Sequence, residues 1–172
     1  MPRAVMKAVR VTLMAHPLTV GQREGAFPLA DEPLDGGRPS LARPPSTRVL
    51  RGPETRCDLL PDAETAPDLR DLDMGTWRGK RLAEIDPVGL ARWVGDLDAA
   101  PHGGESVTAL IDRVRGWLGG LHDGPVLGLT HPAVVRAAVS VATGADYQRV
   151  DVPPLGRALL TGVGGRWNLR LQ

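Results

Sequence analysis

The sequence lacks a second cysteine, an excess of charge of either sign and any long apolar run. Cys57 is the only cysteine among the 172 residues, which excludes an internal disulfide and makes the cytosol the expected compartment. With 21 basic and 20 acidic residues, neither nucleic acid nor an anionic membrane is expected as the main partner. The apolar run after Arg10 ends at His16, too soon for an export signal or a membrane span.

The length and composition that remain are those of an ordinary globular protein. Hydrophobic residues make up 42% of the chain and charged residues 24%. A chain of this length can bury a full core but is too short for two domains of usual size. We therefore expect a single domain over residues 1–172.

Two distant segments have the same form, an apolar run followed by His-Pro. The first is Arg10-Val-Thr-Leu-Met-Ala-His16-Pro17 and the second is Pro125-Val-Leu-Gly-Leu-Thr-His131-Pro132. Such runs are typical of strands buried on both faces in parallel sheets. Ligands bind at the carboxyl ends of such strands, so we expect both histidines to share one site.

The rest of the pattern alternates strand and helix. A strand is predicted over 47–50, a helix from Gly52-Pro53 through Leu60, and helical spacing over 79–117. An apolar helix is predicted over 133–142, and a final hairpin turns at Gly164-Gly165. The economical fold is a three-layer α/β/α sandwich with a mostly parallel sheet.

Four landmarks, in order, resemble those of the histidine phosphatase superfamily, the phosphoglycerate mutase-like enzymes. They are the strand ending at His16, the segment Gly52-Pro53-Glu54-Thr55-Arg56, the segment Leu69 to Gly79 with its Gly-x-Trp-x-Gly end, and Gly104-Glu105-Ser106 with the later Thr130-His131. The resemblance spans nearly the whole chain. It implies a phosphoglycerate mutase-like fold in which a helical cap segment covers about residues 79–105.

The resemblance also implies a role for each matching residue. His16 corresponds to the nucleophile that accepts the phosphoryl group, giving a phosphohistidine. Arg56 and His131 would bind the phosphoryl oxygens. Asp71 stands where the family has its general acid, normally a glutamate. No metal or other cofactor is expected, since the spacing of the histidines with Cys57 fits no zinc pattern.

Several departures from the family pattern weaken the expected phosphate site. Ala15 stands where the family has arginine, which removes a cation and several donors. Pro17 replaces a glycine and offers no N–H, and Gly52 replaces a serine hydroxyl. Asp71 is one methylene shorter than glutamate. Losing one oxyanion donor typically lowers the rate by about a hundredfold or more.

Other residues are secondary candidates for the same site. Arg23, in the loop expected to cover the site, could supply the missing positive charge, or could be an ordinary exposed arginine. Arg51 could serve if the register of the Gly-Pro segment is shifted. Asp73 is the alternative to Asp71, and Glu105 is a further proton donor or a helix N-terminal residue.

Two functions are consistent with these residues. The first is a small phosphatase that hydrolyses a phosphate monoester of a small molecule through phospho-His16. The alternative is a catalytically degenerate protein of this fold that binds another anionic ligand or a protein partner, or performs non-phosphoryl acid–base chemistry. Arg23 distinguishes them: hydrolysis is favoured if it reaches the phosphate, and binding is favoured if it points to solvent. No oligomeric state is indicated.

Overall fold

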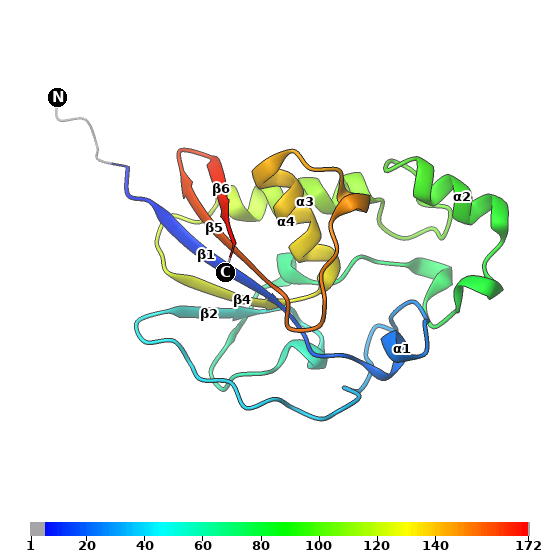
Figure 1. The fold of residues 1–172 in the computed structure, drawn as a ribbon, viewed down its shortest axis with the longest axis horizontal. Helices are drawn as coiled ribbons and strands as arrows, with labels where there is room; N and C mark the ends of the chain where they lie inside the picture. The colour runs from blue at the N-terminus through cyan, green and yellow to red at the C-terminus, as the bar shows by residue number, and fades with distance from the viewer. Residues whose placement is uncertain (1–5, 172) are drawn as a thin grey trace.

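A computed structural model describes residues 6–171 as one six-stranded sheet with helices packed on it (Figure 1). The strand order is β3-β2-β4-β1-β5-β6. The strands are β1 (Val9–Ala15), β2 (Arg48–Arg51), β3 (Glu64–Thr65), β4 (Val126–Thr130), β5 (Arg157–Val163) and β6 (Arg166–Arg170). The first four in spatial order run parallel, while β5 pairs antiparallel with both β1 and β6. The predicted α/β fold and the closing hairpin are confirmed, and the sheet is mixed.

The longer helices cover one face of the sheet. The α-helices are α1 (Val20–Arg23), α2 (Pro87–Gly95), α3 (Val107–Gly119) and α4 (Pro132–Thr143). Short 3-10 turns cover Thr55–Cys57, Pro67–Leu69, Gly75–Trp77, Leu82–Glu84 and Tyr147–Arg149. Helices α3 and α4 pack on each other and bury apolar side chains against alternate residues of β1, such as Val11 and Leu13 (Figure 1). This face holds the main core.

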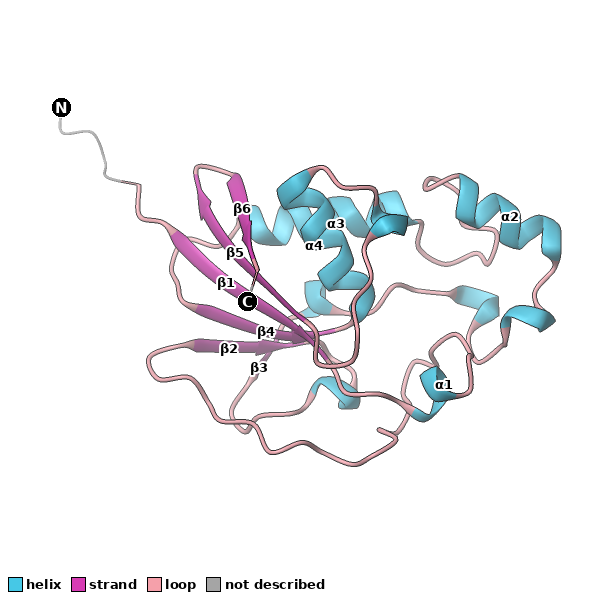
Figure 2. Ribbon diagram, in the orientation of Figure 1, coloured by secondary structure: helices cyan, strands magenta, loops and turns pink. Residues whose placement is uncertain are grey.

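The opposite face of the sheet is covered by loops and short turns (Figure 2). Met14, Leu127 and Leu129 pack there against Leu59 and Leu60. The helix predicted from Gly52-Pro53 through Leu60 is therefore wrong: only the 3-10 turn Thr55–Cys57 forms. Two adjacent leucines are both buried in this layer, and Pro61 follows them, so the chain leaves the helical conformation after Asp58.

The segment expected to form a helical cap, residues 79–105, contains one α-helix, α2, and the 3-10 turn Leu82–Glu84. Asp86 caps the start of α2 through its side chain, and Pro87 occupies the first turn. Helix α2 lies away from the sheet (Figure 1), and its Trp93 packs against Trp77 and Phe27, with ring centroids 6.0 and 5.9 Å away. Trp77 is buried as a core anchor. Within residues 6–171, no helix combines the length and apolar character needed to cross a membrane.

Candidate active site

The two His-Pro segments meet because their strands are parallel neighbours. Ala15 at the end of β1 is in register with Thr130 at the end of β4. His16 and His131 follow directly, with their ring centroids 5.2 Å apart and the ring planes at 74°. The backbone N–H of His16 donates to the carbonyl of Thr130 at 2.9 Å, which ties the two strand ends together. The structure thus brings together the two histidines that the sequence placed in one site.

The ring of His16 is held in a single tautomer by its own neighbour. Its Nδ1 lies 2.7 Å from the carbonyl oxygen of Pro17, which can only accept, so Nδ1 carries the proton. Nε2 therefore keeps a free lone pair. Burial, together with the nearby His131, lowers the pKa of His16 to about 4. The imidazole is neutral at physiological pH, the form that can act as a nucleophile.

Arg56 is buried next to His131, and both terminal nitrogens of its guanidinium have acceptors. Its Nη2 donates to Asp71 Oδ2 at 2.8 Å, and its Nη1 donates to the carbonyl oxygens of Leu29 and Ala30. Its Nε lies 3.3 Å from Nδ1 of His131. The arginine predicted to bind phosphate is in the site, with Asp71 as its ion-pair partner.

His131 faces a carboxylate on each ring nitrogen. Nε2 donates to Glu54 Oε2 at 2.7 Å, and Nδ1 lies 3.3 Å from Asp71 Oδ2. Burial disfavours the imidazolium, but Asp71, Cys57 and Glu54 outweigh it and raise the pKa of His131 to about 10. Burial opposes ionisation of Glu54, yet the bond to His131 dominates and lowers its pKa to about 2. Both cations of the site are thus paired with carboxylates.

Asp71 is positioned by the strand end and by its own backbone. The Thr130 hydroxyl donates to the carbonyl of Leu69 at 2.8 Å, which anchors the segment leading to Asp71. The backbone N–H of Asp71 donates to Glu54 Oε1 at 3.0 Å, while Asp71 Oδ1 accepts from the N–H of Leu72. Glu54 and Asp71 therefore support each other.

Gly52 and Glu54 share space beside His131. A Cβ at position 52 would lie 2.8 Å from the carbonyl oxygen of Leu69, 3.0 Å from Glu54 Oε2 and 3.1 Å from His131 Nε2. A serine here would require this neighbourhood to shift. Glycine at position 52, where the resemblance predicts serine, therefore leaves the room in which Glu54 contacts His131.

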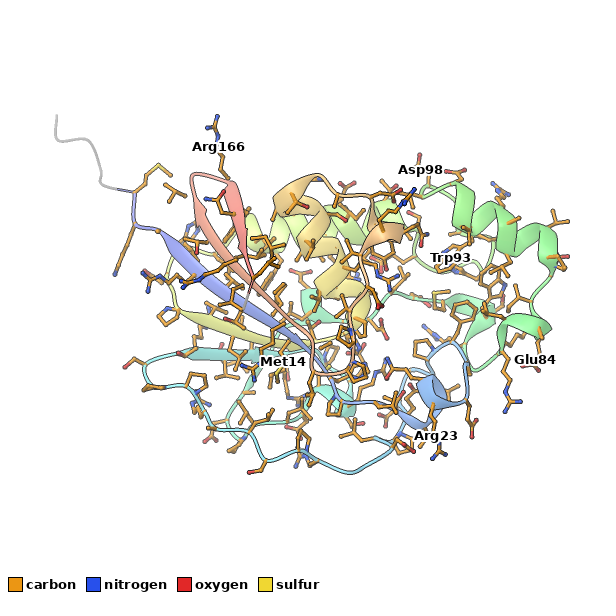
Figure 3. The ribbon with its side chains drawn as sticks, viewed as in Figure 1. Met14, Arg23, Glu84, Trp93, Asp98 and Arg166 are labelled. Carbon is orange, nitrogen blue, oxygen red and sulfur yellow. The ribbon has the colours of Figure 1, made fainter. Side chains whose placement is uncertain are left out.

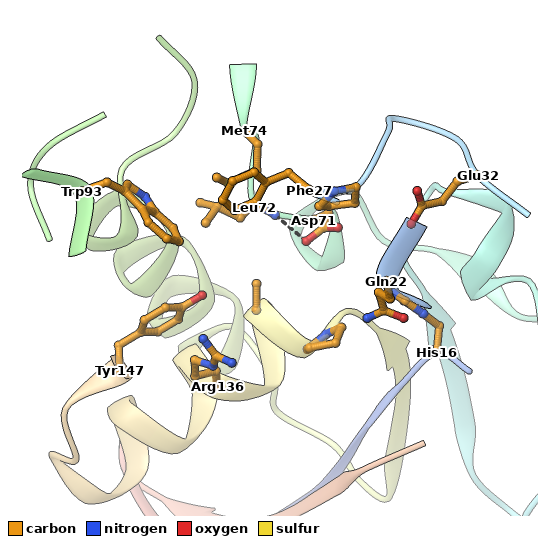
Figure 4. Close-up of a pocket in the computed structure, with 13 residues that line it drawn as sticks. His16, Gln22, Phe27, Glu32, Asp71, Leu72, Met74, Trp93, Arg136 and Tyr147 are labelled. Carbon is orange, nitrogen blue, oxygen red and sulfur yellow. Dashed lines mark hydrogen bonds between the residues drawn. The ribbon is translucent and has the colours of Figure 1, made fainter. Parts of the chain in front are cut away.

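His16 and Asp71 line an open cleft of about 180 Å³. Figure 4 shows His16, Gln22 and Glu32 on one side of the cleft and Trp93, Tyr147 and Arg136 on the other. The remaining lining residues are Phe27, Pro28, Leu72, Met74, Pro132 and Ala133. The walls are thus mainly apolar between two polar ends.

Arg136, on α4, is a cation at the far end of this cleft. Its Cζ lies 5.2 Å from the centroid of the Tyr147 ring. Its Nε is buried and has no hydrogen-bond partner among residues 6–171. The sequence did not single out Arg136, because an arginine five residues after His131 looks like any helix residue. The sequence does not identify Glu54 either, because its segment has the pattern of a helix start.

The secondary candidates lie outside the cleft. Arg23 pairs with Asp35 at 2.7 Å and its side chain is 57% exposed on the outer side of α1 (Figure 3). Arg51 donates to the carbonyl of Gly52. Asp73 pairs with Arg78, and Glu105 accepts from Arg113 at 2.7 Å. The structure therefore brings none of these four to His16.

Ala15, at the position where the resemblance predicts an arginine, is part of the main core. Ala15 is fully buried and packs among the side chains under α3 and α4. An arginine at this position would have to displace that packing. The arginine that the family has at this position is absent, and Arg23 in the following segment does not replace it, because Arg23 pairs with Asp35 on the surface.

A neutral histidine, a second histidine, an arginine and a carboxylate thus gather at the carboxyl edge of the parallel strands, where α/β sheets bind ligands. The family model described as the histidine phosphatase superfamily (branch 1) matches residues 53–171. The chain belongs to this superfamily. A comparison with curated proteins finds no match.

Solved structures with the same fold agree with this assignment. Among them are the protein TTHB049 and a phosphoglycerate mutase, both from Thermus thermophilus. Each has 26% identity and a TM-score of 0.73 and covers 94% of this chain, and this chain covers 93% and 96% of them, respectively. An Escherichia coli K-12 protein described as a candidate alpha-ribazole-5'-P phosphatase has a TM-score of 0.78 with 96% of both chains covered. Its identity of 19% shows likeness of fold alone.

Proposed function

We propose that this protein hydrolyses a small phosphate monoester through a phosphohistidine at His16. The observation that carries the proposal is the state of the His16 ring. Its Nδ1 proton is bound to the Pro17 carbonyl and its pKa lies at about 4, so a neutral Nε2 lone pair is available at the cleft. No separate base is needed for attack.

The reaction follows two displacements. Nε2 of His16 attacks phosphorus, the ester P–O bond breaks, and Asp71 in its acid form gives a proton to the leaving oxygen. Water then attacks the phosphohistidine, Asp71 takes a proton from it, and the N–P bond breaks. An alcohol and inorganic phosphate leave, and His16 and Asp71 return to their starting forms.

Substrate binding requires an exchange of partners at Arg56. In the free protein its Nη2 is bound to Asp71. A phosphoryl oxygen that takes this donor releases Asp71 Oδ2 from Arg56, so that the carboxyl group can turn towards the leaving oxygen. Binding of the phosphate and preparation of the acid are therefore one event.

The cleft supports a substrate with an apolar body. Phe27, Trp93 and Tyr147 provide aromatic walls, and the volume of about 180 Å³ suits a small organic group. Arg136 would meet an acceptor or a second anionic group at the end opposite His16. Because the single cysteine favours a reducing compartment, we place the activity in the cytosol.

The second candidate is binding of an anion without phosphoryl transfer. It is favoured by the pairing of Arg56 with Asp71 and of His131 with Glu54, which leaves both cations neutralised. The exposure of Arg23, which does not supply a further charge, favours it as well. The two candidates differ in whether a covalent phosphoenzyme forms.

Hydrolysis of an aryl phosphate and of a panel of phosphorylated metabolites tests the proposal. We expect wild-type turnover, an acid-labile and base-stable phosphoenzyme after a rapid quench, and loss of both in His16→Ala. The control is His122→Ala, which changes an exposed histidine remote from the cleft. Phosphate binding without a phosphoenzyme would instead support the second candidate, and turnover that survives in His16→Ala would contradict the proposed nucleophile.

A further inference from the structure

We propose that Glu54, Cys57 and His131 form a binding site for one zinc ion. A carboxylate oxygen of Glu54, Sγ of Cys57 and Nε2 of His131 all lie within 4.8 Å of one another. The first two come from the turn after β2, and the third from the end of β4, its neighbour in the sheet. Sequence spacing did not indicate this cluster, because the sheet brings together residues 74 positions apart.

The separation between the sulfur and nitrogen donors matches that of tetrahedral zinc. With Zn–S and Zn–N bonds of about 2.3 and 2.0 Å, the two ligand atoms are separated by about 3.5 Å. Cys57 Sγ lies 3.4 Å from His131 Nε2. Glu54 Oε2 is closer, at 2.7 Å, because it accepts a hydrogen bond from this nitrogen. Zinc would replace the bridging proton, and the carboxylate would draw back by roughly 0.7 Å to reach an ordinary ligand separation.

The chemistry of the donors selects zinc over the hard cations. Thiolate and imidazole are typical zinc ligands, whereas calcium and magnesium take oxygen ligands. A thiolate and a carboxylate also balance the charge of a divalent ion, so the complex is neutral where Cys57 and His131 are fully buried. The cluster thus combines a suitable charge with suitable ligand types.

Asp71 supplies the outer support that histidine ligands usually have. Its Oδ2 lies 3.3 Å from Nδ1, the other ring nitrogen of His131. A carboxylate at this place fixes the ring and leaves Nε2 to the metal. Gly52 leaves the space beside Nε2 and Glu54 free of a side chain. Glu54 also lines a surface cavity with Arg56 and Asp71, which gives a route of entry.

Metal titration of the tag-free, full-length protein at neutral pH tests the site. Isothermal calorimetry with zinc sulfate is expected to show one ion per chain. Cys57→Ser and Glu54→Gln should each weaken binding by about 100-fold or more, and Asp71→Asn by about tenfold. His122→Gln, which removes an exposed histidine elsewhere, should leave affinity unchanged.

Cobalt(II) provides a readout that needs no variant. Because Cys57 is the only cysteine, a sulfur-to-cobalt charge-transfer band can come from this residue alone. The band should appear with one equivalent of cobalt and disappear on addition of zinc. It decides the question even if Cys57→Ser fails to fold.

Three results would overturn the site. They are the absence of zinc binding to the wild type at micromolar free metal, cobalt binding without a thiolate band, and zinc affinity that is lost in His122→Gln but retained in Cys57→Ser. None involves a substrate, so the outcome is independent of whether the protein hydrolyses phosphate esters.

Discussion

The nucleophile side and the cation side of this site are built in different ways. His16 is fixed by two backbone carbonyls, those of Pro17 and Thr130, and no charged side chain is needed to hold its tautomer. Arg56 and His131 instead depend on the carboxylates of Asp71 and Glu54, which come from other segments. Because the acceptor at residue 17 is a backbone carbonyl, the tautomer of His16 does not depend on the side chain at that position. The charge available from Arg56 or His131, in contrast, changes when one carboxylate partner is replaced.

Among the residues around the nucleophile, the largest change should follow from replacing the buried Arg56. Arg56→Lys keeps a positive charge but loses the planar fork that can hold two oxygens. We expect kcat/KM for an aryl phosphate to fall by about 100-fold to 1000-fold. The matched control is Arg51→Lys, on the same segment but outside the cleft, which should change turnover little. Equal losses in the two variants would mean that the effect is structural.

The pH dependence of kcat/KM should report the protonation state of His16. Attack requires neutral His16, whose pKa lies at about 4 because burial and His131 disfavour its charged form. We expect kcat/KM to lose about tenfold per pH unit only below that value. An acidic limb near the ordinary histidine pKa of 6.5 would show that His16 is more open to solvent than this structure has it. Circular dichroism at each pH checks that the fold persists.

Glu54→Gln should strengthen the binding of an anion by His131. Removing this negative charge beside His131 is expected to tighten competitive inhibition by inorganic phosphate about tenfold. Glu64→Gln, whose parent residue forms an exposed ion pair with Arg48 at the edge of the sheet, is the control. Weaker phosphate inhibition in Glu54→Gln would mean that this carboxylate orients His131 for the anion.

The same variant should also change stability with pH. The folded-state pKa of Glu54 is about 2, below its ordinary 4.5, since burial, which would raise it, is outweighed by the bond to His131. Its contribution is therefore present above pH 4.5 and is lost as the pH falls towards 2. Urea unfolding should show a difference of about 1 to 3 kcal/mol at neutral pH that closes through this acidic window.

A smaller and selective effect is expected at the far end of the cleft. Arg136→Gln should lower kcat/KM several-fold for phosphate esters that carry a second anionic group. It should leave a simple aryl phosphate nearly unchanged. Arg149→Gln, at an exposed arginine that ends the 3-10 turn Tyr147–Arg149, is the control. A uniform loss with all substrates would argue for a packing role beside Tyr147.

The smallest effect is expected at Arg23. Its ion pair with Asp35 is exposed, and such pairs contribute little stability. We expect Arg23→Ala to alter kcat/KM by less than about twofold. Steady-state kinetics at low and high salt measure this, and a large loss would show that the loop delivers Arg23 to the substrate after binding.

Sequence reasoning predicted the parts of the site that follow from strand ends. His16 and His131 each close an apolar run, and the parallel pairing of β1 with β4 brings them together. The family pattern located Arg56 and Asp71. Glu54 was not predicted, because its role depends on a contact with His131 across the sheet. The helix predicted after Pro53 does not form, because Leu59 and Leu60 are adjacent and both pack against the face of the sheet that the loops cover.

Arg136 and Arg23 show that the sequence does not predict which arginine faces the cleft. Both are arginines near the expected site, and nothing local tells which one faces the cleft. Helix α4 turns Arg136 towards Tyr147, whereas the four-residue helix α1 leaves Arg23 on its outer side. Side-chain direction depends on the packing of the whole element, which a short pattern does not contain.

The paired charges under the histidines have a consequence for how substrate arrives. Arg56 with Asp71 and His131 with Glu54 cancel each other at distances of 2.7 to 2.8 Å, so little field extends from them into solvent. An anionic ester is then guided to the cleft weakly, and its rate of encounter should hardly respond to ionic strength. Selectivity would arise after contact, when an incoming phosphate competes with the protein's own carboxylates for the same donors.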